Sequence, residues 1–255
     1  MKVNYHMHTS RCHHALGSDE DYIRAAIQAG FDEVGFADHT PWRYPDGYVS
    51  GMRMKESELD GYIESIQRLQ KKYQNQISVK IGLECEYFPE MMPWLEETLK
   101  EKPVNFIILG NHFHLDDMHG RYYGWPTESE EVLLDYVSDV KAALAAGLYS
   151  YIAHPDLVHY RHPEDEIYRK AMTELCLAAK AADTPLEFNL LGYREHRQYP
   201  CEAFWKIASA CQCQAIIGFD AHEPARLKDN DLYQQAKDYL FSLNLEIVDK
   251  IRFLK

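Results

Sequence analysis

The sequence predicts an α/β protein, a distorted (β/α)7 barrel that spans residues 1–255 as one domain. Three observations lead to this prediction. Short apolar runs alternate with longer segments of helical spacing, and the runs are too uniformly apolar for a half-exposed sheet, which favours a parallel sheet covered by helices. No Ser/Gly-rich linker or low-complexity stretch marks a boundary. With 255 residues, 46% of them hydrophobic, the chain can bury one sizeable core.

Seven runs have the length and composition of buried strands. They cover residues 3–5, 34–37, 78–83, 106–109, 150–153, 186–188 and 215–219. Segments with helical spacing lie between them, several with acidic residues at their starts. These segments cover residues 18–23, 57–73, 129–147, 165–182, 201–212 and 232–243. Seven βα units of this kind are enough to close or nearly close a barrel.

Residues able to bind a metal ion recur at the ends of the apolar runs. They are His6, His8, His14, His39, Glu84, His112, His154, Asp220 and His222. Imidazoles and carboxylates are ligands of Zn, Fe and Mn, and the carboxyl ends of barrel strands converge at one mouth. A capped or solvent-facing side chain is the simpler interpretation of any single histidine. Their recurrence at so many strand ends predicts a metal cluster instead.

The spacing within two motifs supports this prediction. His6 and His8 are two residues apart, so on an extended chain they leave the same face with Cα atoms about 7 Å apart. Asp220 and His222 repeat that spacing. Asp38 is a candidate for orienting a ligand imidazole through a hydrogen bond. The other histidines are interpreted as exposed or hydrogen-bonded loop residues; they are His114, His119, His159, His162, His196 and one of the pair His13 and His14.

Composition narrows the classes of function. The formal net charge of -13 disfavours the general phosphate attraction of nucleic-acid binders. Six cysteines without CxxC spacing suit a reducing compartment. The start MKVNYHMHT has no apolar signal stretch, and no run approaches the roughly 18 apolar residues of a membrane span. We therefore expect a cytoplasmic protein without membrane contact, and the sequence makes no prediction of its oligomeric state.

Several motifs together resemble the polymerase-and-histidinol-phosphatase (PHP) superfamily over nearly the whole chain. They are HMHT (6–9), ADHT (37–40), IAHP (152–155) and GFDAH (218–222), with GLE (82–84) and GNH (110–112) between them. The resemblance implies a site for three divalent ions. In that site His6, His8, Glu84 and Asp220 would hold one ion; Glu84, as a bridge, with His112 and His154 a second; and His14, His39 and His222 a third.

Two elements favour the histidinol-phosphate phosphatase branch of the superfamily. They are Cys12-His13-His14 after HMHT and Gly192-Tyr193-Arg194 after the sixth apolar run. The chain departs from that branch in Leu190 and Leu191, where small or hydroxylated residues are common, and in Phe219, where Ser is usual.

The resemblance implies a phosphomonoesterase for a small phosphorylated metabolite. The first candidate reaction converts L-histidinol phosphate to L-histidinol and phosphate, a step of histidine biosynthesis, through hydroxide generated with the help of Zn, Fe or Mn. Glu84, Asp220 and His222 would belong to the catalytic centre. A phosphoryl group also needs cationic partners, for which arginine is well shaped. Arg194 is the first candidate, with Arg161 and Arg197 as alternatives, and each could instead be a solvated loop residue.

Two other functions are compatible with a metal cluster. A nuclease or phosphodiesterase is the main alternative, against which the acidic composition counts, because a strand-tracking groove requires Lys, Arg and stacking platforms. A non-catalytic module that keeps its metals for stability is the other. Structural metal sites are usually closed cages of four ligands, whereas ligands around a barrel mouth leave positions open. The many aromatic residues in predicted loops could enclose a cationic or imidazole-bearing substrate.

Overall fold

The computed structural model describes residues 1–254, apart from the side chain of Asp46. The strands are β1 (Val3–Asn4), β2 (Glu33–His39), β3 (Ser78–Cys85), β4 (Phe106–Leu109), β5 (Leu186–Asn189), β6 (Gln214–Gly218) and β7 (Glu246–Ile247). The α-helices are α1 (Asp19–Gln28), α2 (Leu59–Tyr73), α3 (Met92–Glu101), α4 (Glu130–Ala145), α5 (Glu166–Ala181), α6 (Leu190–Glu195), α7 (Glu202–Ala210) and α8 (Asn230–Ser242). Short 3-10 helices lie at η1 (Ser10–Cys12), η2 (Pro45–Gly47), η3 (Glu56–Glu58) and η4 (Pro224–Lys228).

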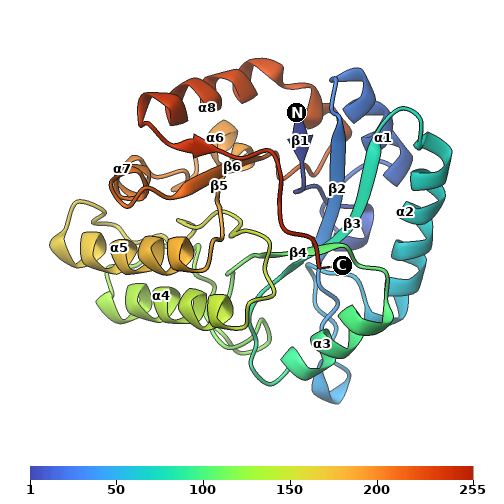
Figure 1. The fold of residues 1–255 in the computed structure, drawn as a ribbon. Coiled ribbons are helices and arrows are strands. Elements are labelled where there is room, and N and C mark those ends of the chain that lie inside the picture. Colours follow the sequence, from blue (N-terminus) through green and yellow to red (C-terminus); the bar gives the residue numbers. More distant parts are fainter. Residues whose placement is uncertain (255) are drawn as a thin grey trace.

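The strands form a curled parallel sheet with helices on its outer side (Figure 1). One ladder has the order β1-β2-β3-β4 and the other β5-β6-β7, and every pairing is parallel. Single bridges join the two ladders, from Leu109 through Ile152 to Leu186 on one side and from Met7 to Ala221 on the other. The predicted α/β class and parallel sheet are therefore confirmed.

The predicted count of seven barrel strands differs from the structure at two places. Residues 150–153 lie between β4 and β5 and hydrogen-bond to both, but a single bridging residue, Ile152, is too short to form a ladder. The short strand β7 pairs with the start of β6, and no apolar run in the sequence marked it. Helix α3 was also missed; its Pro93 lies in the first helical turn, where proline is tolerated.

Helix ends follow local sequence signals. Ser18 caps α1, and a capping box with Asp21 satisfies amide groups at the start of that helix. Ser129 caps α4, where its side chain accepts a hydrogen bond from the backbone amide of Val132. The apolar faces of these helices pack on the outer side of the sheet, where Tyr22 of α1 and Val140 of α4 are fully buried.

The inside of the curled sheet holds a second apolar cluster that includes Tyr5, Phe106 and Tyr151. Gly35 and Gly82 make room for it, because a Cβ atom at either position would collide with the ring of Phe106. These rings fill the interior below the carboxyl ends of the strands. Polar groups therefore collect in a separate layer at those ends.

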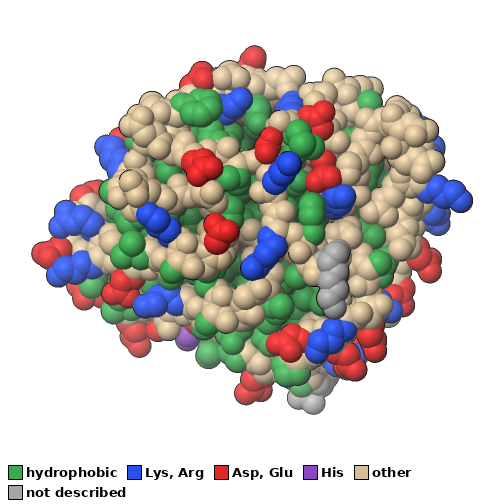
Figure 2. All heavy atoms as spheres, in the orientation of Figure 1, with side chains coloured by type: hydrophobic (Ala, Val, Ile, Leu, Met, Phe, Trp, Pro, Cys, Tyr) green, Lys and Arg blue, Asp and Glu red, His purple; other side chains and the backbone are tan. Residues whose placement is uncertain are grey.

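Charged side chains of both signs are mixed over the face shown in Figure 2, with apolar side chains between them. None of the described helices combines the length and the apolar character that a membrane span requires.

Candidate metal centre

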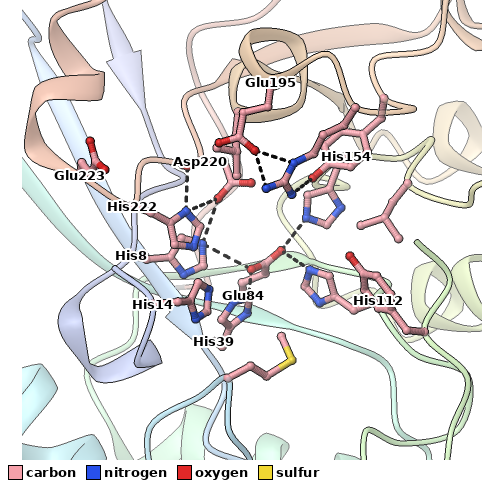
Figure 3. A pocket seen from close by; sticks show the side chains of 16 residues that line it. His8, His14, His39, Glu84, His112, His154, Glu195, Asp220, His222 and Glu223 are labelled. Carbon is pink, nitrogen blue, oxygen red and sulfur yellow. Dashed lines mark hydrogen bonds and ion pairs between the residues drawn. The ribbon is translucent and has the colours of Figure 1, made fainter. Parts of the chain in front are cut away.

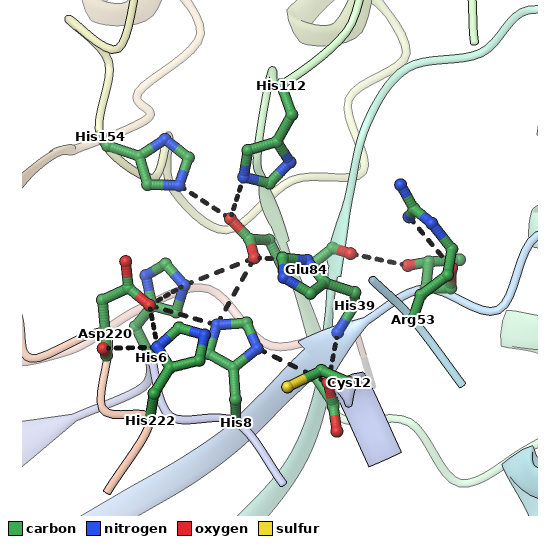
Figure 4. A network of polar contacts seen from close by, with 12 residues as sticks. His6, His8, Cys12, His39, Arg53, Glu84, His112, His154, Asp220 and His222 are labelled. Carbon is green, nitrogen blue, oxygen red and sulfur yellow. Dashed lines mark hydrogen bonds and ion pairs between the residues drawn. The ribbon is translucent and has the colours of Figure 1, made fainter. Parts of the chain in front are cut away.

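Glu84, near the end of β3, lies at the centre of the predicted ligands and is 1% exposed (Figure 4). Its Oε1 is 2.9 Å from His154 Nε2 and 3.3 Å from His112 Nε2. Its Oε2 is 3.0 Å from His39 Nδ1 and 3.6 Å from the Nε2 atoms of both His6 and His8. One carboxylate thus faces imidazoles from four separate segments of the chain.

Asp220 follows β6, and its carboxylate faces the imidazoles of His6 and His8, which also face Glu84. Its Oδ1 is 3.2 Å from His8 Nε2 and 3.5 Å from His6 Nε2. Asn189 at the end of β5 donates a hydrogen bond to the other oxygen at 3.1 Å. Burial by itself would raise the pKa of Asp220, but the charges of His6 and His8 hold that pKa well below its usual range.

His14, His39 and His222 form a second cluster beside the first. One ring nitrogen from each lies within 4.8 Å of the other two. The ring of His222 stacks on His8 with centroids 4.1 Å apart and on His14 at 4.7 Å. Burial lowers the pKa of His39 to about 4 and that of His222 to about 3, so both rings stay neutral, which is the form that binds metals.

Many polar atoms of the candidate ligands are buried and have no hydrogen-bond partner among the described residues. They include His6 Nε2, His8 Nε2, His39 Nδ1, Glu84 Oε2, Asp220 Oδ1 and His222 Nε2. Each unpaired buried polar group costs about 1–3 kcal/mol, so a cluster of them facing one another fits a site that binds cations. Groups of three with their ligand atoms within 4.8 Å are His6, His8 and Asp220; His6, Glu84 and His154; His8, His39 and Glu84; His14, His39 and His222; and His8, Cys12 and His222.

The far nitrogen of several imidazoles has a defined partner. His6 Nδ1 lies 2.8 Å from Glu187 Oε1, and His112 Nδ1 lies 2.9 Å from Glu86 Oε1. His14 Nδ1 lies 2.6 Å from the carbonyl oxygen of Cys12. Such partners fix the orientation of a ring and direct its other nitrogen towards an ion.

Sequence reasoning missed two of these partners. Glu86 follows Glu84 at the two-residue spacing of a strand, so both carboxylates point to one side. Glu187 is an acid inside an apolar strand, where a buried charge requires a partner. The two-residue spacing and the acid within an apolar run are the sequence signals that could have identified Glu86 and Glu187. Asp38, the predicted orienting residue, is buried with Oδ1 3.5 Å from His8 Nδ1, and it accepts hydrogen bonds from the backbone amides of Thr9 and His39.

Arg53 completes the network behind His112. Its side chain is fully buried, and its Nη1 and Nη2 atoms lie 3.0 Å from the two oxygens of Glu86. Its Nε donates to Asp117 Oδ2 at 3.1 Å. Burial would raise the pKa of Glu86, but the charges of Arg53 and His112 hold it well below its usual range. Glu86 therefore meets His112 as a carboxylate.

A cavity of about 320 Å³ opens above the cluster (Figure 3). Tyr122, Leu157, Leu191 and Tyr199 contribute to its walls, with Glu223 at the side of His222. Among the described residues of the lining, Arg197 is the one Lys or Arg.

Arg197 is held in a fixed position at the cavity wall. Its Nε donates to Glu195 Oε2 at 2.8 Å, and its Nη1 donates to the Tyr199 hydroxyl at 3.0 Å. The left-handed backbone of His196, with φ of 53°, ends α6 and turns the chain back just before Arg197.

Neither of the two other candidate arginines, Arg194 and Arg161, belongs to the described lining of the cavity. Residues 190–195 form helix α6. Leu191 and Glu195, four residues apart, face the cavity, while Arg194 lies on another face with its Nε 3.5 Å from Asp229 Oδ2. Arg161 is 58% exposed and 3.8 Å from Glu128.

The remaining loop histidines take part in other contacts. His114 Nδ1 lies 2.9 Å from Asp139 Oδ2 and 3.0 Å from the Tyr123 hydroxyl, behind the cluster. His162 is about half exposed near Glu128, and His119 is largely exposed.

A curled parallel sheet with clustered imidazoles and carboxylates at its carboxyl ends defines a metal-dependent α/β enzyme fold. The chain belongs to the PHP domain family, whose sequence profile matches residues 4–190.

Known relatives are similar over most of the chain. It is 29% identical over 231 residues to a protein of Deinococcus radiodurans named a probable histidinol-phosphatase, covering 87% of this chain and 86% of that one. It is also 29% identical over 260 residues to the histidinol-phosphatase of Bacillus subtilis, covering 87% and 94% of the two chains.

A solved structure shares the fold. The histidinol phosphate phosphatase of Lactococcus lactis, crystallised with Zn, L-histidinol and phosphate, superposes with a TM-score of 0.77 at 19% identity. The match covers 100% of this chain and 99% of that one.

Proposed function

We propose that this protein is a metal-dependent phosphomonoesterase that hydrolyses L-histidinol phosphate to L-histidinol and phosphate. The observation that carries the proposal is the convergence of unpaired imidazole and carboxylate atoms on Glu84 at the floor of a cavity with an arginine in its wall. The names of the relatives, and the ligands of the L. lactis enzyme, support the same substrate. We take residues 1–255 as one domain with this activity.

We propose that the centre holds three divalent ions, Zn, Fe or Mn. The residues for the first are His6, His8, Glu84 and Asp220; for the second Glu84, His112 and His154; and for the third His14, His39 and His222. When bound, clustered divalent ions supply a nucleophile from water at neutral pH and neutralise charge on a phosphoryl group. Glu84 offers both of its oxygens to different imidazole sets, which supports its role as the bridging ligand.

We assign the phosphate contact to Arg197, since its guanidinium lies in the cavity wall next to the cluster. Glu195 and Tyr199 hold it in one orientation, so little side-chain entropy is lost when an anion binds. The apolar side chains of Leu157 and Leu191 keep water away from the phosphoryl group and strengthen that contact.

The same cavity suits the cationic half of histidinol phosphate. The rings of Tyr122 and Tyr199 offer faces for an imidazole, and Glu223 offers a carboxylate for an ammonium group. A cavity of about 320 Å³ with one arginine in the described lining fits a small phosphomonoester better than a nucleic-acid strand.

A panel of three substrates tests the proposal. Phosphate release is measured from histidinol phosphate and from an aryl phosphate, and cleavage is measured on single-stranded DNA, each with chelated protein and after addition of Mn or Zn. We expect metal-dependent turnover with the highest kcat/KM on histidinol phosphate. Comparable activity on DNA, or histidinol phosphate turnover that survives chelation, would refute the proposal.

A further inference from the structure

Cys12 lies inside the candidate metal centre, although none of the three proposed ligand sets includes its sulfur. It ends the 3-10 helix η1, four residues after His8, and its amide donates to the carbonyl oxygen of Thr9 at 3.1 Å. The side chain is 0% exposed. Its Sγ atom and one ring nitrogen each of His8 and His222 lie within 4.8 Å of one another (Figure 4). The turn at η1 therefore brings a thiol to the imidazoles of two motifs that are far apart in the sequence.

The surroundings of Cys12 differ from those of the other buried cysteines. Cys85, Cys176 and Cys213 are members of the main apolar cluster, where a thiol packs as a small hydrophobic group. Cys12 belongs to neither of the two apolar clusters formed by the described residues. Packing in the core therefore does not account for a buried cysteine at this position.

The imidazoles beside Cys12 have unpaired nitrogen atoms. His8 is 0% exposed, and both of its ring nitrogens, like Nε2 of His222, lack a hydrogen-bond partner among the described residues. The carbonyl oxygen of Asp220 lies 3.1 Å from His222 Nδ1, so Nε2 is the nitrogen of that ring available to an ion. The carbonyl oxygen of Cys12 lies 2.6 Å from His14 Nδ1. Cys12 thus orients one proposed ligand of the third ion through its backbone and faces another through its side chain.

The three proposed ion positions differ in the charge of their ligands. The sets for the first and second ions both include the carboxylate of Glu84. The set for the third ion consists of three neutral imidazoles and compensates none of the charge of a divalent cation. A thiol that binds such a cation loses its proton to solvent and becomes a thiolate. Cys12 would therefore supply a negative charge at the one position whose proposed ligands carry none.

We propose that Cys12 is a further ligand of the third ion and that its thiolate makes this position selective for Zn over Mn. This inference deepens the proposed metal-dependent function and rests on it. Zn is commonly bound by cysteine and histidine together, because soft thiolates favour Zn, whereas carboxylates suit Mn. Imidazole and carboxylate ligands alone accept Zn, Fe or Mn. The sulfur is therefore the group that distinguishes the third position from the other two.

The test uses Co²⁺ as the probe, because it binds the same nitrogen, oxygen and sulfur ligands as Zn. A thiolate on Co²⁺ gives an intense sulfur-to-cobalt charge-transfer band in the ultraviolet, which imidazole and carboxylate ligands do not give. The metal-loaded full chain is first treated with iodoacetamide to block the partly exposed Cys201 and Cys211, and it is then chelated and titrated with Co²⁺. We expect the band in the wild type and its loss in Cys12→Ser, while the visible d–d bands of bound Co²⁺ persist in both.

Metal preference is measured in a second experiment. Wild type and Cys12→Ser are chelated, dialysed against equal concentrations of Zn and Mn, and analysed for their metal content. The variant should retain less Zn and more Mn per chain than the wild type, because a serine hydroxyl is a harder and weaker ligand than a thiolate. An unchanged ratio of Zn to Mn would overturn the selectivity.

Cys85→Ser is the matched control, because Cys85 is also 0% exposed and directly follows Glu84, but its sulfur contacts the Thr40 hydroxyl at 2.6 Å within the apolar cluster. This variant should keep the band. The wild-type spectrum tests the proposal without any variant: visible bands of bound Co²⁺ with no charge-transfer band would overturn the ligand role of Cys12. A band that survives Cys12→Ser would do the same, and neither result would affect the proposed phosphatase activity. A chain that binds no Co²⁺ and releases no phosphate with any of the metals would overturn both proposals.

Discussion

Replacement of Arg53 by methionine should destabilise the protein strongly, although Arg53 is neither a predicted ligand nor part of the cavity wall. Its side chain is 0% exposed and makes hydrogen bonds to Glu86, to Asp117 and to the carbonyl oxygen of Thr40. Methionine is of similar length but carries no charge. The carboxylate of Glu86, which is 1% exposed, would remain buried without the guanidinium that contacts both of its oxygens.

Removing one partner of a buried ion pair costs about 3–5 kcal/mol, because the other charge is left uncompensated. We therefore expect Arg53→Met to lower the free energy of unfolding by about that amount. In a domain of this size each kcal/mol shifts Tm by about 2–4 °C, so the expected fall is about 6–20 °C. The double variant Arg53→Met/Glu86→Gln removes both charges and should recover a large part of the loss.

The assay is urea and thermal unfolding of chelated protein, so that bound ions do not add to the stability. Arg24→Met is the control, because Arg24 is 60% exposed and solvent screens its ion pair with Glu20, so the free energy of unfolding should stay close to that of the wild type. Glu86→Gln alone should also weaken metal retention about 10–100-fold, since Glu86 orients His112. An Arg53→Met protein within about 1 kcal/mol of the wild type, or a double variant less stable than the single one, would refute this reasoning.

Chelation should abolish phosphate release while the far-ultraviolet circular dichroism is largely retained, because the core lies below the metal layer; unfolding on chelation would contradict this. Glu84→Gln should reduce turnover by several orders of magnitude and His114→Gln much less, measured as kcat on histidinol phosphate; equal losses would show that the centre is misassigned. Arg197→Ala should lower kcat/KM about 10²-fold or more, with Arg194→Ala as the control outside the cavity, and the reverse order would return the phosphate contact to Arg194. Burial raises the pKa of Asp156 from 3.8 to about 7, so its stabilising protonated form is lost as pH rises through that value. From pH 5 to pH 8 the wild type should therefore lose about 2–3 kcal/mol of unfolding free energy relative to Asp156→Asn, and a constant difference in urea unfolding would exclude the shift.

The sequence alone determined the α/β class, the parallel sheet and the family. Apolar runs with histidine and acidic residues at their ends predict this architecture, because parallel strands bring their carboxyl ends to one edge wherever the helices between them lie. For the same reason, the structure gathers the nine candidate ligands, Glu84 among them, into one layer, and their assignment to individual ions stays a prediction.

Only the tertiary structure decided which residues surround the candidate metal ligands. The choice between Arg194 and Arg197 depends on the path of the chain after β5, where a short helix and a left-handed residue direct Arg197 into the cavity. Glu86 and Arg53 are 33 residues apart in the sequence but form an ion pair in the structure, and no local sequence pattern predicts this contact. Strand-end positions follow from local periodicity, whereas loop side chains and buried ion pairs depend on which segments pack together, and packing is a property of the whole fold.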